Sequence, residues 1–446
     1  MPVQRIISFP SVLALLGSAF LLGAVVPKSH GSGPLDPRAD AMPHGSAEAG
    51  LTASLSCETD GAARIDAAFS RWTELVRDRE SLSQTDLERR AEGIIADIFA
   101  VDGMSREILA RRWDSSREHE RQQFRDALVR ALREVLLPYF ESQEELPQLR
   151  PSAEEWVVDG TSFRARYWLV TSAGSDWFSF RLSAADGACS IVDLWKDDRS
   201  VIASLSRRVK RQLDDYSFPY MIAALGEYDS VILADFEDED VGSLPHGWTW
   251  RDQDKDKNKP YRVQIENGNH YLEATDQGES VILGREVRWN LDEFPYISFR
   301  VRVNRIPVGG DERDNSKVDS AAGLYVTLNK KFFGKIPESV KYVWSSTLPV
   351  GVAVRREGIG RPWQVVFGSG EDGLGEWRRY VFDLREAYED TFGGDSPSRS
   401  VGIGVLSDAN SLHSEAYADY DDIRALRTAP RGVSSGVAEI VPPIAN

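Results

Sequence analysis

The fold of the first half of the chain follows from residues 163–195, which read FRARYWLVTSAGSDWFSFRLSAADGACSIVDLW. Large apolar side chains occupy alternate positions here, which is the period of a β-strand with one buried face. The pattern predicts strands over 163–170, 177–182 and 190–195. Their shared apolar face holds Phe163, Tyr167, Leu169, Phe178, Phe180 and Leu182.

Apolar residues at spacings of three and four flank this stretch on both sides and predict amphipathic helices. The predicted helices cover residues 87–98, 108–113, 124–139 and 201–213. Leu205 and Val209 lie on the apolar side of the last one. Helices before and after an antiparallel sheet predict an α+β domain with the helices packed on one face of the sheet.

The second half of the chain has a different sequence pattern. Residues 231–427 contain many short β-type runs separated by Gly, Asp and Pro turns, which is typical of an all-β sandwich. The chain is therefore expected to be multidomain, with an α+β domain at 61–228 and an all-β domain at 231–427. Residues 428–446 show no periodicity and are expected to form a flexible tail.

The N-terminus predicts export. Arg5 precedes an almost wholly apolar run over residues 6–26, as in a secretory signal. Residues 1–27 are thus a signal peptide, or, since no clear cleavage site closes the run, an uncleaved anchor in the inner membrane. Residues 28–60 are rich in Gly, Pro, Ser and Ala and predict a flexible linker. The expected location is the periplasm.

Composition narrows the function classes. A formal charge of −17 argues against nucleic acid as a partner, because phosphate binding needs a basic surface. The sequence lacks a zinc-protease helix motif, a serine nucleophile elbow and a phosphate-binding glycine loop, so we expect no enzyme and no required cofactor. Cys57 and Cys189 are either paired in an oxidising compartment or two separate thiols.

A family resemblance covers roughly residues 62–228. MSREILARRW (104–113), SSREHERQQFRDALVRALREVLLPYF (115–140), WFSFRL (177–182) and CSIVDLWKDDRSVIASLSRRVKRQL (189–213) resemble the MlaC-type, toluene-tolerance family. In this likeness Asp193 and Ser200 match the aspartate and serine of the family's strand–helix signature. The residues Lys196 to Arg199 depart from it, because a Gly-containing turn is usual there.

The resemblance implies carriage of phospholipid between bacterial membranes, with supply from membrane-anchored lipid-transport complexes. An acyl-chain pocket needs a dry apolar lining. The implied cavity wall consists of Phe163, Tyr167, Leu169, Phe178, Phe180, Leu182, Leu205 and Val209. The same face would equally suit an ordinary α+β core, in which case the domain is a scaffold.

The second half of the chain resembles other known folds than the first half does. An opening Phe-Glu-Asp (236–238) and a closing Asp-Asp-Ile (421–423) resemble the two ends of jelly-roll, galactose-binding-like sandwiches. The interior resembles an exported bacterial family of no assigned function. The likeness implies a structural calcium on Glu237 and Asp422; the alternative is that these carboxylates are solvated or paired with arginine.

A glycan is the alternative ligand of the second half. Trp344, Trp363 and Trp377 could stack on sugar rings or form sandwich core. The first option defines a cell-envelope carbohydrate- or partner-binding protein as the alternative function. A hydrolase built on the sandwich is a third hypothesis.

Overall fold

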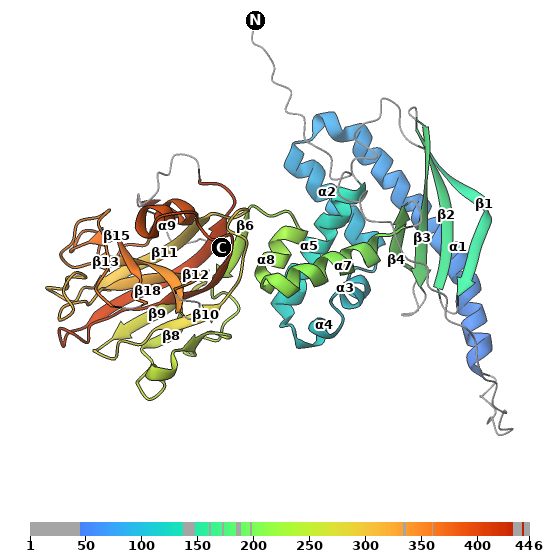
Figure 1. The fold of residues 1–446 in the computed structure, drawn as a ribbon. Coiled ribbons are helices and arrows are strands. Elements are labelled where there is room, and N and C mark those ends of the chain that lie inside the picture. The colour runs from blue at the N-terminus through green and yellow to red at the C-terminus, as the bar shows by residue number, and fades with distance from the viewer. Residues whose placement is uncertain are drawn as a thin grey trace, which may run out of the picture. The chain divides into compact units, whose positions relative to one another are not determined.

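A computed structural model describes residues 45–136, 148–159, 162–171, 174–183, 189–196, 199–332, 336–358, 360–430 and 439–440. Two parts follow one another along the chain (Figure 1): a helical region with a five-stranded sheet, and a sandwich of two larger sheets. No helix in these described ranges has the length and apolar character needed to cross a bilayer. The apolar run at residues 6–26 lies outside them.

The helices of the first part bury one apolar stripe each. In α2, Leu87, Ile94 and Ile98 are buried at spacings of three to four, and the Ser83 hydroxyl caps the helix by accepting from the Asp86 N–H at 3.1 Å. The helices of this part are α1 Gly45–Asp78, α2 Gln84–Ile98, α3 Val101–Leu109, α4 Arg111–Ser115, α5 Glu118–Leu136, α7 Val201–Asp215 and α8 Phe218–Leu225.

The five-stranded sheet is antiparallel in the order β1-β2-β3-β4-β5. Its register pairs Tyr167 with Phe178 and Phe163 with Leu182, so the expected apolar residues share one face. The strands are β1 Gln148–Asp159, β2 Ser162–Thr171, β3 Gly174–Ser183, β4 Ser190–Lys196 and β5 Arg199–Ser200. The three expected strands are present as β2, β3 and β4.

Four elements differ from the sequence-based expectation. β1 was not expected, because Pro151 and a bulge between Pro151 and Trp156 interrupt its alternation. α1 begins at Gly45, so residues 45–60 are helical rather than part of a flexible linker, as suits their many Ala, Leu and Glu residues. In the expected tail, β19 (Glu439–Ile440) pairs with β16. The expected helix over 124–139 ends at Leu136 in the described residues.

The second part is a β-sandwich. One sheet has the order β14-β15-β13-β12-β17-β10-β7, and the other has the order β19-β16-β11-β18-β9-β8, with β6 also pairing β18. All of its pairs are antiparallel except β13 with β15. The first and last strands of the predicted domain, β6 and β18, lie side by side, with Ala234 opposite Ile423.

Other bounds of the second part are β6 Ser230–Ala234, β7 Thr249–Trp250, β8 Tyr261–Glu266, β9 Asn269–Asp276, β10 Leu283–Glu286, β11 Tyr296–Arg305, β12 Ala322–Phe332, β13 Ile336–Ser345, β14 Ala353–Val354, β15 Trp363–Ser369, β16 Arg378–Asp383, α9 Leu384–Phe392, β17 Ser400–Val405 and β18 Ala416–Leu426.

The parts have separate hydrophobic cores that meet at α8. Met221 and Ile222 are buried in the core of the helical region, whereas Tyr220 and Ala223 are buried in the core of the sandwich. A short helix that is apolar on all sides is expected to be buried on all sides. α8 therefore serves both cores.

Candidate functional site

The first candidate site is an apolar cavity of about 60 Å³ in the helical region. Side chains of α1, the ends of α2 and α5 and the five-stranded sheet surround it, and within the described part of the chain every lining residue is apolar. They are Ile65, Ala68, Phe69, Trp72, Ile98, Phe99, Leu136, Leu149, Leu169, Phe178, Phe180 and Ile191. We call this space the apolar cavity.

Three of the expected wall residues line the apolar cavity, namely Leu169, Phe178 and Phe180. Phe178 and Leu169 are almost fully buried, and Phe180 is partly buried. The Tyr167 ring meets Phe180 edge-on at 5.8 Å, directly behind the wall. Burial raises the pKa of the Tyr167 hydroxyl to about 12, so this group is neutral at physiological pH.

The remaining expected residues lie elsewhere. Leu182, Leu205 and Val209 are buried in the same core but do not line the apolar cavity. The side chain of Phe163 lies outside the described residues, although its backbone pairs in β2.

α1 contributes a part of the cavity wall that was not among the expected residues. Ile65, Ala68, Phe69 and Trp72 supply one side of the apolar cavity. Their spacing of three, one and three is that of a helix face, so the signal was available in the sequence.

The matched aspartate and serine of the family likeness are joined in the structure. The Ser200 hydroxyl donates to the Asp193 carboxylate at 2.6 Å and accepts from the Ala203 N–H at 2.9 Å. The other carboxylate oxygen accepts from the Ile202 N–H at 3.1 Å. Burial raises the pKa of Asp193, although the hydrogen bonds from Ser200 and Ile202 act to lower it. The pair thus caps α7 and ties it to β4, which is a structural role.

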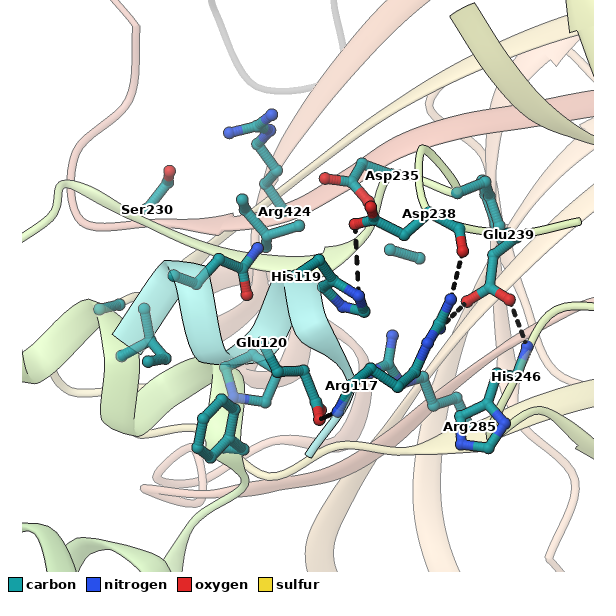
Figure 2. Close-up of a pocket in the computed structure, with 18 of the residues that line it drawn as sticks. Arg117, His119, Glu120, Ser230, Asp235, Asp238, Glu239, His246, Arg285 and Arg424 are labelled. Atoms are coloured by element: carbon teal, nitrogen blue, oxygen red, sulfur yellow. Dashed lines mark hydrogen bonds and ion pairs between the residues drawn. The ribbon is translucent and has the colours of Figure 1, made fainter. Parts of the chain in front are cut away.

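The second candidate site is larger and charged (Figure 2). Its volume is about 370 Å³, within the range of about 300–1,000 Å³ that is usual for small-molecule sites. The start of α5, α8, the segment after β6 and β10 contribute to it. Its charged lining includes Arg117, His119, Glu120, Asp235, Asp238, Glu239, Arg285 and Arg424. We call this space the charged cavity; nothing in the sequence predicted it.

Ion pairs occupy part of the lining of the charged cavity. Arg117 donates to Glu239 at 2.7 Å and to the backbone oxygen of Asp238. His119 lies 3.5 Å from the Asp238 carboxylate, and the His246 N–H donates to Glu239 at 2.8 Å (Figure 2). These contacts fix the segment after β6 against the start of α5.

Asp235 and Arg285 differ from these pairs. Neither forms an ion pair within 4.0 Å with a residue in the described part of the chain. Arg285 donates to the backbone oxygen of Leu233 at 2.8 Å. Burial raises the pKa of Asp235, although the positive charge of Arg424 acts to lower it. Burial also lowers the pKa of Arg285. Both shifts mean that the charged forms are poorly solvated.

The carboxylates expected to hold calcium have other partners. Asp422 accepts from Arg379 at 2.6 Å and from the Arg424 guanidinium, and Glu237 accepts from the His270 N–H at 3.3 Å. Burial raises the pKa of Glu237. Within the described ranges, no three His, Cys, Asp or Glu side chains gather as a metal site would require. Asp422 is therefore paired with arginine, which was the alternative to a calcium site at this residue.

Two of the tryptophans considered for sugar stacking are core. Trp344 is 1% exposed and donates to the Gly370 oxygen at 3.0 Å. A side chain at Gly368 would collide with its indole, because a Cβ there would lie 2.3 Å from the ring. Trp377 is 7% exposed beside Arg300, and Trp363 is partly exposed. Neither Trp344 nor Trp377 presents a free ring face.

Cys189 is disulfide-bonded and buried. The chain has one other cysteine, Cys57, whose side chain lies outside the described residues.

One part of the chain is similar to a described family. Residues 246–424, within the sandwich, match the model of a family described as "Protein of unknown function (DUF3047)". The match covers part of the sandwich and shows a likeness of that part to this family. No curated protein matches the chain in sequence.

Several solved structures show weak similarity. The phospholipid-binding protein from Ralstonia solanacearum, solved with a phospholipid, is 10% identical and has a TM-score of 0.31, over 37% of this chain and 94% of that one. The Emp47p carbohydrate recognition domain is 13% identical with a TM-score of 0.24, over 48% and 98%. The family 11 xylanase from Neocallimastix patriciarum is 9% identical with a TM-score of 0.19, over 38% and 96%. Scores of this size establish no shared function.

Proposed function

We propose that this protein is a non-catalytic, exported lipid-binding protein whose helical region holds the acyl chains of a phospholipid between α1 and the five-stranded sheet. The observation that carries this proposal is the composition of the apolar cavity. All twelve described residues that line it are apolar, from Ile65 on α1 to Ile191 on β4. A site for hydrocarbon requires no polar partner, and each methylene removed from water contributes about 0.8 kcal/mol.

The size of the apolar cavity sets a condition on this function. About 60 Å³ is far below the volume of a usual ligand site. An acyl chain therefore enters only when α1 moves away from the sheet, exposing Phe178 and Phe180. Beside the apolar cavity, α1 is held by apolar contacts and by an exposed ion pair of 2.9 Å between Arg71 and Asp97, of the kind that adds at most about 1 kcal/mol. Nearer its start, α1 lies against the disulfide-bonded Cys189, because a Cβ at Gly61 would lie 3.2 Å from the Cys189 sulfur. The part of α1 beyond Gly61 is thus the displaceable wall of the proposed site, and its movement pivots about the end near Cys189.

Export fits this function, because phospholipid traffic between two membranes takes place in the periplasm. Arg5 and the apolar run over residues 6–26 support it. A reporter fused after residue 60 should be active only outside the cytoplasm, and cytoplasmic activity would contradict export. Membrane-anchored complexes that supply the lipid are part of the same proposal.

Lipid content tests the proposed function directly. The full chain, purified from a bacterial host without added lipid, should release phospholipid that mass spectrometry detects near one molecule per chain. It should also take up labelled phospholipid from vesicles. A folded protein that neither contains nor takes up phospholipid would exclude the lipid-carrier function. Calorimetry with oligosaccharides addresses the carbohydrate alternative, which the burial of Trp344 and Trp377 does not favour.

A further inference from the structure

The charged cavity differs from the apolar cavity in place, size and chemistry. It is formed by the start of α5, α8, the segment after β6 and β10, none of which lines the apolar cavity. Its volume of about 370 Å³ suits a small molecule. Aromatic side chains, among them Trp248, border its charged groups.

Most carboxylates near Arg285 already have partners. Glu239 accepts from Arg117 and from the His246 N–H. Glu120 accepts from the Arg117 N–H at 3.0 Å. These groups leave Asp235 as the nearby carboxylate without an ion pair among the described residues.

Asp235 and Arg285 line the same cavity without an ion pair between them within 4.0 Å. Arg285 donates to the backbone oxygen of Leu233, two residues before Asp235, so the two charged groups lie in one part of the cavity. The negative charge of Asp235 also opposes the lowering of the pKa of Arg285 by burial. An unpaired charge in a poorly solvated site is costly. A molecule that presents a cation to Asp235 and an anion to Arg285 would relieve both costs together.

We infer that the charged cavity is a second ligand site, which binds a small zwitterion with its ammonium on Asp235 and its anionic group on Arg285. A simple cation or anion would satisfy one of the two side chains and leave the other unpaired. The inference does not depend on the proposed lipid function, since the two cavities share no lining residue.

Two sources supply this chemistry: an amino acid, with a carboxylate, and an ethanolamine phosphate, with a phosphate. Titration calorimetry on the full chain should compare alanine and O-phosphoethanolamine with ethanolamine, acetate and inorganic phosphate. We expect at least one zwitterion to bind about tenfold more tightly than either of its single-charge counterparts. Preference for alanine or O-phosphoethanolamine then identifies the source.

Variants test the roles of the two side chains. D235N and R285Q should each weaken binding of the zwitterion about tenfold or more. D256N and R90Q change exposed residues outside the cavity and should leave binding unchanged. Each variant is checked by thermal melting.

Three results would overturn the inference. They are no binding of either zwitterion at millimolar concentration, equal binding of a single-charge counterpart, and unchanged binding in a folded D235N or R285Q variant. The first two use the unaltered protein, so the test stands even where a variant does not fold.

Discussion

Arg300 on β11 donates to the Asp421 carboxylate on β18 at 2.9 Å, and the two side chains are 1% and 2% exposed. Asn269 donates to the same carboxylate oxygen at 3.1 Å, and the Trp377 ring lies 4.9 Å from the Arg300 guanidinium carbon. This ion pair joins two neighbouring strands of one sandwich sheet. A buried pair of this kind is costly to break, because removal of one partner leaves the other charge buried.

Single and double substitution of this pair should therefore differ. Burial raises the pKa of Asp421 to about 7, so the measurement is made at a higher pH, at which this carboxylate is charged. There D421N is expected to lower the free energy of unfolding by about 3–5 kcal/mol, because Arg300 is left without its counter-charge. R300M/D421L removes both charges and should cost much less. Urea unfolding followed by tryptophan fluorescence measures both. R300M and D421L are also measured singly, and a double variant whose loss of stability equals the sum of these two losses would contradict the coupling of the pair.

Ser200 offers a test of the α7 cap. S200A removes the hydroxyl that accepts from the Ala203 N–H and donates to Asp193. We expect a loss of about 1–2 kcal/mol, which is usual for a lost N-cap. S204A is the matched control, because the Ser204 hydroxyl donates to the Ser200 carbonyl and accepts from the exposed Arg207 side chain, and caps no backbone N–H. Equal melting temperatures for S200A and S204A would argue against the cap.

Asp254 should confer stability that is sensitive to acid. Its side chain is buried in the acidic run 252–258, with Arg251 at 3.1 Å and Lys257 at 3.1 Å. Burial opposes ionisation, but the hydrogen bond from Lys257 and the charge of Arg251 hold the pKa of Asp254 below its usual value of 3.8. The folded state thus favours the carboxylate.

The sign of the pH effect follows from this shift. The stability from Asp254 is present above pH 3.8 and is lost as the pH falls toward the lower pKa of the folded state. D254N should be less stable at pH 7 and should lose less stability on acidification than the unaltered protein. Thermal melts from neutral to acid pH give the comparison. Parallel curves would contradict a role for the Asp254 charge.

Calcium should not stabilise the sandwich through Asp422. Its two carboxylate oxygens accept from Arg379 and Arg424, so a cation would have to displace two guanidinium groups. We expect the melting temperature to stay unchanged on addition of millimolar calcium or of a chelator. A rise with calcium that E237Q or D422N abolishes would restore the calcium site that the jelly-roll likeness implies.

The secondary structure was predictable where the two-residue repeat of a β-strand continues over several residues. In residues 163–170 and 177–182 large apolar side chains recur at every second position, although Trp168, Val170 and Trp177 lie on the other face, and both runs are strands in the described register. β1 was hidden because Pro151 and the bulge before Trp156 break the alternation. Sequence spacing alone does not reveal the charged cavity, because its lining runs from Arg117 to Arg424 and comes together only through tertiary packing. The same holds for Arg300 and Asp421.

The wall of the apolar cavity was predictable in part, and its residues allow a paired test of the lipid proposal. Phe180 lines the apolar cavity and is partly buried, whereas Leu182, two residues further along β3, is fully buried away from it. A carboxylate at either position is unpaired in apolar surroundings, at a cost of several kcal/mol unless it reaches water.

F180D and L182D should therefore have different consequences. When α1 moves, water can reach position 180, so F180D should remain folded and lose bound phospholipid. L182D places the charge in the closed core and should unfold the helical region. Circular dichroism melts and mass spectrometry of bound lipid separate the two results. If F180D unfolds the region as L182D does, Phe180 is ordinary core; if F180D is folded and retains a full complement of lipid, the acyl chains do not bind at the apolar cavity.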